Sequence, residues 1–518
     1  MDNFKLFCNE IKVLLGENSI TLNPSLLQKE SENTLGIPRG IKAVLFASSL
    51  DQVKQIVSQA NRFSVPLYPI SGGKNLGYGD KIPPADNQVL LDLSGMNKIR
   101  EFDRVQGKVV IEPGVTQQQL YDFLKDKEFC MDATGAGTDA SIIGNTLEGG
   151  FGHTPLGNHR KEITGTEIVF GNGRLFQAGT FPGLGPDLNG LFVQSNFGIV
   201  TAMKIPLMRK PRCYESLLIS LQEDRHLEFL IDTLGLLREN ETLTSLVHVA
   251  NATRSLISTR DCPLEFQGRI IRNDEAVRLM SSPLIKVGVW SAIGGLYGSA
   301  GQVAAKKKDI RKAFGTRARV RFFNTRGIRR IGNLLAGPLG GILGLRTRLG
   351  SGLASIRYIH DLGSGIPSNE ALDHIQWKVK NRQDMGLIWY APTFPATGSS
   401  ARKVAMAAEL LFHNFGFDFP LTMTLVEPDK IIGVLSISFN KNNPEEQERA
   451  HRLYGALHEQ FEQEGLFPYR TSILGLSKVH FVEEGKEKTL KELKSLFDPK
   501  NIIAPGRYGI SPSTLSKS

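Results

Sequence analysis

The sequence has few cysteines and no long hydrophobic run. Its 518 residues include four cysteines, none of them in a CxxC pair, which argues against a disulfide framework and a structural zinc site. The longest apolar segment, residues 331–345, contains glycine and proline and falls short of the roughly 20 residues that span a membrane. The N-terminus mixes acidic with apolar residues and lacks a small-residue cleavage site, unlike a signal peptide. We therefore expect a cytoplasmic protein without a transmembrane helix.

Several common functional motifs are also missing. Neither GxGxxG nor GxxxxGK[ST] occurs, so the two widespread nucleotide fingerprints are absent. The ten histidines include no HExxH, which leaves a metal enzyme unsupported. No CxxCH occurs, so we expect no haem on this chain.

Positive charge is concentrated in one segment. The net charge is +10, yet residues 302–348 contain thirteen Lys or Arg and one acid, Asp309, so the remainder is slightly acidic. Such a segment can dock on an anionic membrane or an acidic partner, and the alternative is a solvated basic face beside a core helix. Aromatic residues of the kind that stack bases are not interleaved with it, so we expect no nucleic-acid binding.

Length and composition predict a folded protein with two domains. The chain is longer than one hydrophobic core usually serves, and 41% hydrophobic with 22% charged residues is close to the globular average. From 37 to 211, glycines are dense and short β-rich runs alternate with helical stretches. From 212 to 464, glycine-rich turns thin out and helices alternate with strands. Both regions are typical of α+β domains.

The first glycine-rich motif, PISGGKNLGYG at residues 69–79, directly follows a predicted strand. Successive glycines let backbone N–H groups converge on a phosphate, and Ser71, Lys74 and Asn75 add donors. A simple hairpin or loop is the alternative.

The second motif, residues 134–157, contains seven glycines in twenty-four residues. That density exceeds what packing needs, so the backbone is expected to pass close to a flat or charged group such as a large planar cofactor. Asp139 and His153 are its candidate titratable residues. The alternatives are a helix cap for Asp139 and a core position for His153.

Three shorter motifs complete a pattern: LFVQSNFGIVT at 191–201, YR at 469–470 and APGR at 504–507. In this order the five motifs resemble the vanillyl-alcohol oxidase and 4-cresol dehydrogenase (p-cresol methylhydroxylase) family of FAD-linked oxidases. The resemblance runs over residues 37–211 and 363–510.

The resemblance implies an α+β, two-domain PCMH-type FAD-binding fold with an antiparallel-sheet cap domain over the flavin. We expect an FAD-binding domain at 37–211, a cap or substrate domain at 212–464, and a C-terminal segment, 465–511, that returns to the FAD domain. The residues expected to bind FAD are Ser71, Gly72, Gly73, Lys74, Asn75, Gly137, Ile143, Gly144, Asn145, Gly152, Ile199, Val200 and Arg507. A fixed positive charge near the flavin N1/C2 edge, expected from Arg507, favours hydride acceptance.

The resemblance also implies the chemistry. In this family two tyrosines and an arginine hold a para-substituted phenol as phenolate while a hydride leaves its benzylic carbon for flavin N5. The matching residues are Tyr78, Tyr469 and Arg470, and Asp139 matches an acid beside N5. The expected substrate is a 4-hydroxybenzylic alcohol or a 4-alkylphenol.

Departures from the family pattern refine these expectations. His153 stands where the phenol oxidases have a third tyrosine, and an imidazole can also bind an oxyanion. Leu387 and Ile375 stand at the two positions from which relatives tether FAD, so we predict noncovalent FAD. A one-residue shift would instead bring His374 to the flavin.

Because His153 replaces the third tyrosine, a second hypothesis remains. The protein is then an FAD oxidoreductase of the same fold that acts on a non-phenolic alcohol or hydroxy acid, for example in a biosynthetic pathway. The electron acceptor is either dioxygen or a partner such as a cytochrome. The family resemblance also predicts a homodimer.

Overall fold

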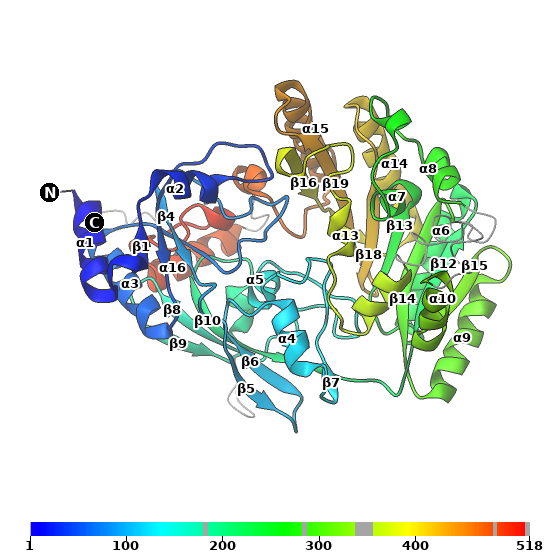
Figure 1. Cartoon of the computed structure of the whole chain (residues 1–518), viewed down its shortest axis with the longest axis horizontal. Helices are drawn as coiled ribbons and strands as arrows, with labels where there is room; N and C mark the ends of the chain where they lie inside the picture. Colours follow the sequence, from blue (N-terminus) through cyan, green and yellow to red (C-terminus); the bar gives the residue numbers. More distant parts are fainter. Residues whose placement is uncertain (1, 180–184, 282–286, 337–355, 480–483, 513–518) are drawn as a thin grey trace.

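The computed structural model describes residues 2–179, 185–281, 287–336, 356–479 and 484–512 (Figure 1). Two smaller sheets lie in one half of the molecule and one large sheet lies in the other. The helices are α1 (Asn3–Leu15), α2 (Pro24–Ser31), α3 (Leu50–Phe63), α4 (Gln117–Leu124), α5 (Ile142–Leu147), α6 (Leu227–Glu239), α7 (Ala252–Ile257), α8 (Asn273–Met280), α9 (Ala300–Phe314), α10 (Thr325–Ala336), α13 (Glu370–Asp373), α14 (Gly398–Asn414), α15 (Pro444–Gln463) and α16 (Glu484–Phe497).

The first sheet has four strands in the order β1-β2-β4-β3. They are β1 (Ile20–Thr21), β2 (Ile41–Phe46), β3 (Leu67–Ile70) and β4 (Gln88–Asp92). The last three run parallel, with α3 between β2 and β3 as the crossover. Ser49 caps α3 by accepting a hydrogen bond from the backbone N–H of Gln52. The helix buries one stripe of residues at helical spacing against the sheet: Val53, Ile56, Val57 and Ala60.

The second sheet has five antiparallel strands in the order β5-β6-β10-β8-β9. They are β5 (Ile99–Asp103), β6 (Lys108–Ile111), β8 (Gly165–Phe170), β9 (Leu175–Ala178) and β10 (Gly198–Pro206). A two-stranded ribbon joins β7 (Phe129–Cys130) to β11 (Met208–Arg209). The glycine-rich loops lie in the connections of these two sheets, β3–β4 and β7–α5–β8, as their positions between strands predict.

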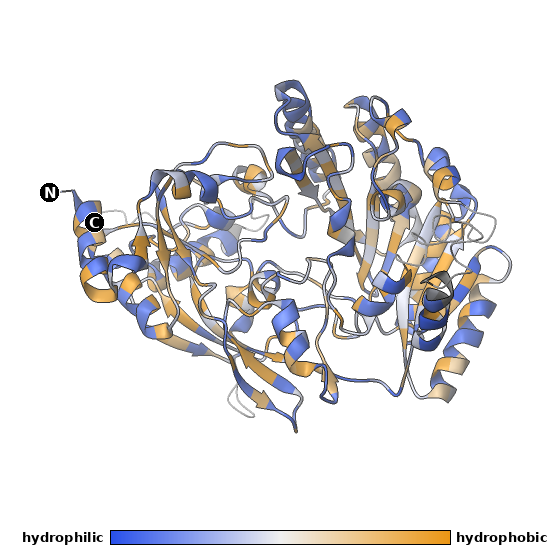
Figure 2. Ribbon diagram, viewed as in Figure 1, coloured by the Kyte–Doolittle hydropathy of each residue, from blue (hydrophilic) through white to orange (hydrophobic). Residues whose placement is uncertain are grey.

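The large sheet has eight antiparallel strands, with the path β15-β12-β14-β13-β18-β19-β16 and β17 paired to β19. The bounds are β12 (Cys213–Leu221), β13 (Val247–Asn251), β14 (Trp290–Gly298), β15 (Arg319–Asn324), β16 (Met385–Tyr390), β17 (Thr393–Pro395), β18 (Leu421–Glu427) and β19 (Lys430–Asn440). The expected antiparallel cap sheet is therefore present. Hydropathy colouring shows hydrophobic and hydrophilic residues mixed along both the strands and the helices of this half (Figure 2).

Alternation along these strands gives the sheet two different faces. Alternate residues pack into a core with α6, α9, α14 and α15: Leu217, Ile219, Val247, Val249, Ala292, Met423 and Leu425. The intervening residues line a cavity on the other face: Leu218, Ser220, His248, Ala250, Ser291, Ile293, Thr422 and Thr424. Polar residues on this second face fit a surface that contacts a ligand.

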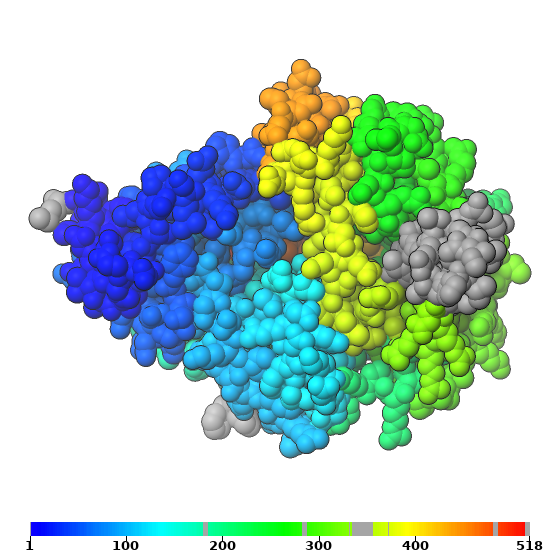
Figure 3. All heavy atoms as spheres, in the orientation of Figure 1, coloured from blue at the N-terminus to red at the C-terminus, as the bar shows by residue number. Residues whose placement is uncertain are grey.

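The two halves meet at the loop between β7 and α5. The backbone N–H of Thr138 donates to Asn369 Oδ1 at 2.8 Å, and Asn369 Nδ2 donates to the Thr138 hydroxyl at 2.9 Å. In the space-filling view the cyan and yellow segments adjoin at the middle of the molecule (Figure 3). A residue of the glycine-rich region is thus fixed directly to the half that contains the large sheet.

The basic segment is only partly described, because 337–348 lie outside the described residues. In α9, Val303, Ile310 and Phe314 are buried, while most of its lysines and arginines are on the surface. Lys307 pairs with Glu215 at 2.8 Å. These contacts match the interpretation as a solvated face beside a core helix, and docking on a membrane or partner stays a prediction. No described helix has the length and apolarity that crossing a membrane requires.

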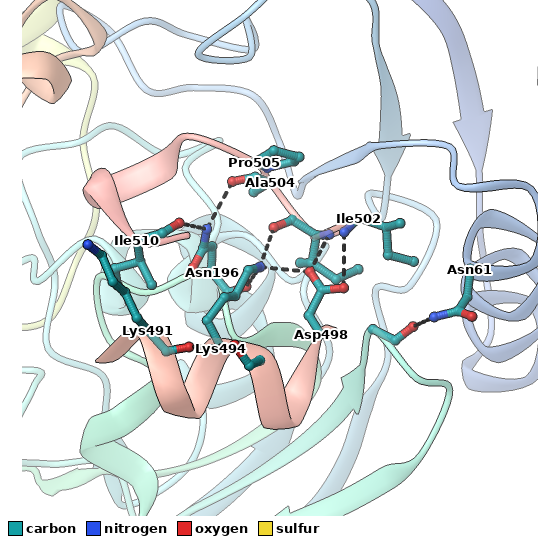
Figure 4. A network of polar contacts seen from close by, with 12 residues as sticks. Asn61, Asn196, Lys491, Lys494, Asp498, Ile502, Ala504, Pro505 and Ile510 are labelled. Carbon is teal, nitrogen blue, oxygen red and sulfur yellow. Dashed lines mark hydrogen bonds and ion pairs between the residues drawn. The ribbon is translucent and has the colours of Figure 1, made fainter. Parts of the chain in front are cut away.

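The C-terminal tail packs against the first sheet through a buried ion pair. Leu67 in β3 exchanges backbone hydrogen bonds with Ile502 and Ala504, each at 2.7 Å. The fully buried Lys494 ammonium donates to the Asp498 carboxylate at 2.7 Å, and also to two backbone carbonyls (Figure 4). Asp498 in turn accepts from the backbone N–H groups of Ile502 and Ile503. The pair therefore fixes the path of the tail.

We expect Lys494→Met to destabilise the fold by about 3–5 kcal/mol, because it leaves the buried Asp498 charge unpaired. The matched control is Lys491→Met on the same helix. Lys491 pairs with Glu487 at the surface, so its loss should cost less than about 1 kcal/mol. Urea unfolding monitored by circular dichroism measures both variants, and equal destabilisation would contradict this account of the tail.

Candidate active site

A cavity of about 890 Å³ lies between the two halves of the molecule. Its walls come from the glycine-rich loops, the cavity face of the large sheet, and the C-terminal segment. This volume lies in the range of small-molecule and cofactor sites, roughly 300–1,000 Å³. Most of the predicted cofactor-binding residues line it: Ser71, Gly72, Gly73, Lys74, Asn75, Ile143, Gly144, Asn145, Ile199, Val200 and Arg507.

Two glycine-rich loops form one wall because glycine lets them approach each other. A Cβ on Gly144 would lie 2.6 Å from the Ser71 hydroxyl, and one on Gly72 would lie 3.6 Å from the carbonyl oxygen of Asp139. Ser141 caps α5, accepting from the backbone N–H of Gly144 at 3.0 Å. The two loops thus present backbone and short polar side chains to the cavity, which fits a phosphate-containing ligand.

A buried ion-pair cluster joins Glu148 to two arginines. Glu148 lies 2.7 Å from an Arg507 nitrogen and 3.2 Å from Arg470 Nε. Burial alone would raise the pKa of Glu148, but the charges of Arg507 and Arg470 outweigh it and lower the pKa to about 2. Two cations against one carboxylate leave excess positive charge beside the cavity.

The cofactor expected from the sequence fits this site. Arg507 Nη1 and the amide oxygen of Asn145 are both buried without a hydrogen-bond partner among the described residues. Both residues line the cavity. A free guanidinium N–H group beside excess positive charge suits a ring system that becomes negative when reduced. The glycine-rich loops form a wall that suits a phosphate. FAD contains both a pyrophosphate and such a ring system.

The predicted substrate-binding residues come together in the cavity. The Arg470 guanidinium lies 4.1 Å from the centre of the Tyr78 ring, and it hydrogen-bonds the side chain of Asn75. Tyr469 packs against Phe151, with ring centroids 5.8 Å apart. Burial, together with the neighbouring Tyr469, raises the pKa of Tyr78 well above its usual value. Tyr78 therefore stays protonated and can donate a hydrogen bond.

His153 packs against His248, whose ring is tilted by 35° and has its centroid 4.3 Å away. Burial lowers the pKa of His153 to about 4. Burial and the neighbouring His153 lower the pKa of His248 well below its usual value. Thr424 lies 3.0 Å from His248 Nδ1, while His248 Nε2 is buried without a partner. The site therefore presents neutral imidazoles at physiological pH.

Three of the predicted site residues do not line the cavity. Asp139 is exposed, and the atom of Asp139 near Gly72 is its backbone carbonyl oxygen. Its carboxylate is therefore not placed in the cavity lining. Gly137 has φ +93° and packs against Asn369 of the other half. Gly152 lies against Asp132, where a Cβ would come within 2.2 Å of the carboxylate. Close packing accounts for both glycines.

The two tether positions differ in location. Leu387 is fully buried in a small apolar cluster outside the cavity lining, and Ile375 of the same cluster lines the cavity. His374 also lines the cavity, and its Nδ1 lies 2.9 Å from Asp261. Neither aliphatic side chain can form a bond to a flavin.

Sequence reasoning missed Glu148 and His248. Glu148 lies in the second glycine-rich motif as the only acid of its TLEGG run, so a search for a counterion to Arg470 and Arg507 could have found it. His248 comes from the weakly patterned cap region and reaches His153 only through the fold. Nothing in its local sequence indicates a site.

Comparisons with known proteins agree with this geometry. Residues 41–179 match the family model of an FAD binding domain. The 4-cresol dehydrogenase [hydroxylating] flavoprotein subunit of Pseudomonas putida is 27% identical over 98% of this chain and 96% of its own. The 1'-carboxy-chondrochloren decarboxylase of Chondromyces crocatus is 28% identical over 96% of this chain and 95% of its own.

A solved structure extends the likeness to the whole fold. The crystal structure of p-cresol methylhydroxylase with substrate bound superimposes with a TM-score of 0.88 at 26% identity, covering 98% of this chain and 97% of that one. The PCMH-type two-domain fold expected from the sequence is therefore confirmed. This chain is an FAD-dependent oxidoreductase, and over nearly its whole length it is similar to the vanillyl-alcohol oxidase and 4-cresol dehydrogenase family of FAD-linked oxidases.

Proposed function

We propose that the protein oxidises the benzylic carbon of a para-substituted phenol, either a 4-hydroxybenzylic alcohol or a 4-alkylphenol. The observation that carries the proposal is the meeting of Tyr78, Tyr469 and Arg470 in one cavity beside excess positive charge. A relative and a solved structure, both named for cresol, support it.

The residues of the cavity act by holding an anion. Arg470 stays charged because Glu148 and the nearby tyrosines offset the effect of burial and raise its pKa. Its guanidinium and the protonated Tyr78 hydroxyl favour the phenolate form of the substrate, whose electrons can move towards the para position. When bound, FAD supplies the acceptor for the hydride that leaves the benzylic carbon. His153 and His248, both neutral, can accept a proton from a benzylic hydroxyl or from water.

The reoxidation of the flavin belongs to the same proposal. The relative named a flavoprotein subunit favours a separate electron acceptor such as a cytochrome, with dioxygen as the alternative.

A second candidate function is the oxidation of a non-phenolic alcohol or hydroxy acid. His153 in place of a third tyrosine favours it, as does a relative that is named a decarboxylase of a carboxy compound. Anaerobic titration of the holoenzyme separates the two candidates. Bleaching of the flavin by 4-hydroxybenzyl alcohols or 4-alkylphenols supports the first. Bleaching by hydroxy acids but by no phenol supports the second.

Arg470→Ala should slow flavin reduction by a 4-alkylphenol about 100- to 1,000-fold, because the phenolate loses its permanent cation. Anaerobic stopped-flow absorbance measures this rate constant. The control is Arg382→Ala, which changes an exposed arginine outside the cavity. Unchanged reduction in Arg470→Ala would remove this residue from the substrate site.

The rate constant of flavin reduction should not vary between about pH 5.5 and pH 8 through His153, because burial holds its pKa at about 4. Protonation should change the rate only below about pH 5, and His153→Asn should abolish that low-pH change. The measurement is a stopped-flow pH profile with a benzylic alcohol. An inflection near pH 6.5 that disappears in His153→Asn would contradict this prediction, because His153 would then be protonated near neutral pH.

FAD should be released when the holoenzyme is denatured in acid, because Leu387 and Ile375 cannot form a covalent link. Absorbance of the supernatant after precipitation measures the released flavin, and His374→Ala should give the same result. Flavin that stays on the wild-type protein but is released from His374→Ala would identify His374 as the tether.

A further inference from the structure

A third arginine, Arg254, faces the cavity from the half that contains the large sheet. It lies in α7, directly after β13, and the side chain of Asn251 accepts a hydrogen bond from its backbone N–H at 2.9 Å. Arg254 is half-buried and lines the cavity. The guanidinium lies 5.7 Å from the centre of the Trp389 ring. Its position is therefore fixed by the fold.

Arg254 differs from Arg470 and Arg507 in having no carboxylate partner in the part of the chain that the structure describes. Among the described residues it forms no ion pair, and its Nη1 is buried without a hydrogen bond. Burial lowers the pKa of Arg254, whereas Glu148 helps to raise those of the other two. Glu370 also lines the cavity but does not pair with Arg254, and burial raises the pKa of this acid.

An unpaired guanidinium in a cavity is costly unless a ligand completes it. Arginine presents a planar fork of donors that matches the two oxygens of a carboxylate. Arg260 and Arg321 line the same cavity and also have no ion pair among the described residues. The cavity therefore favours an anionic group.

Two routes along the cavity wall connect Arg254 with the residues proposed to bind the phenol. On one side the Trp389 backbone N–H donates to the carbonyl of Gly77, the neighbour of Tyr78, at 3.1 Å. On the other side Tyr358 lies beside Arg254, and a Cβ on Gly135 would lie 3.4 Å from the Tyr358 hydroxyl.

The second route continues through aromatic rings. The same Cβ on Gly135 would lie 3.9 Å from His153 Nε2, and the ring of His153 packs against that of His248. Phe151 packs between His248 and Tyr469, with centroid distances of 6.2 and 5.8 Å. The phenol-binding residues and Arg254 thus lie along one connected wall of the cavity.

We propose that Arg254 binds a carboxylate on the para side chain of the substrate. This inference rests on the proposed function and narrows its substrate class to phenols whose para side chain carries a carboxyl group. Arg470 and the two tyrosines hold one end of such a molecule as phenolate, and Arg254 holds the other. The benzylic carbon between them is thereby positioned beside the flavin site.

The test compares wild-type holoenzyme with Arg254→Met, using 4-hydroxyphenyl alkanoic acids with side chains of increasing length and their methyl esters. We expect the wild type to prefer the acids at one chain length. Arg254→Met should lower kcat/KM for that acid on the order of 10- to 100-fold and leave the esters and 4-alkylphenols nearly unchanged. The control is Arg278→Met, an exposed arginine of α8 paired with Asp274.

Two results would overturn the proposal. One is a wild type that never prefers an acid to its ester. The other is an Arg254→Met variant that loses acids and esters equally, since Arg254 would then act on the fold or the flavin. If Arg254→Met does not fold, Arg254→Lys is tested in its place. It keeps the positive charge but loses the paired N–H donors of the guanidinium, so it should retain part of the preference for the acid over its ester. A preference lost in Arg260→Met but kept in Arg254→Met would assign the carboxylate to Arg260 instead.

A binding measurement separates this inference from the proposed function. Phenylalkanoic acids without the 4-hydroxyl cannot be oxidised as phenols, yet Arg254 should still bind them. Calorimetry should show binding to wild type and about 10-fold or weaker binding to Arg254→Met. If no phenol reduces the flavin, the proposed function fails while this result still supports the carboxylate site. Equal binding to both proteins would refute the carboxylate site.

Discussion

The buried cluster of Glu148, Arg470 and Arg507 is the interaction on which the active site depends. Its members come from the second glycine-rich motif, from the segment after α15 and from the C-terminal tail. Breaking a buried pair leaves an uncompensated charge, which is far costlier than losing a surface pair. The cluster thus joins three distant segments at one point and gives that point a net positive charge. Both the flavin site and the proposed phenolate site use this charge.

The large sheet gives the second constraint. Its strict alternation places apolar residues against the helices and polar residues such as His248 and Thr424 against the cavity. In each strand the residues of the helix-covered face alternate with those of the cavity face. Residues on the cavity face can therefore change while the packing against the helices stays the same. One fold can in this way carry different sites, and two relatives of similar length are named for different reactions.

Much of the flavin site was predictable because glycine-rich loops bind phosphates and cofactors through their own backbone, which the local sequence determines. The loop at residues 69–79 and the motif around Gly144 were found for that reason, and so was Arg507 through its APGR motif. Asp139 is exposed and does not line the cavity in this structure, so its role beside the flavin stays a prediction.

The cap side of the site was less predictable. His248 and Arg254 are single residues in ordinary strand and helix patterns, and only the pairing of strands distant in sequence brings them to the cavity. The order of those strands, β15-β12-β14-β13-β18-β19-β16, is not encoded in any local motif. The same holds for the contact between Thr138 and Asn369, which separate stretches of sequence supply.

The returning tail has a consequence for how the protein is made. Ile502 and Ala504 complete the edge of the first sheet at Leu67, and Arg507 closes the cation cluster a few residues later. During synthesis at about 5–20 residues per second, the glycine-rich loops emerge long before these residues. Until these residues are made, the edge of the first sheet at Leu67 stays open and the cluster of Glu148 and Arg470 lacks Arg507.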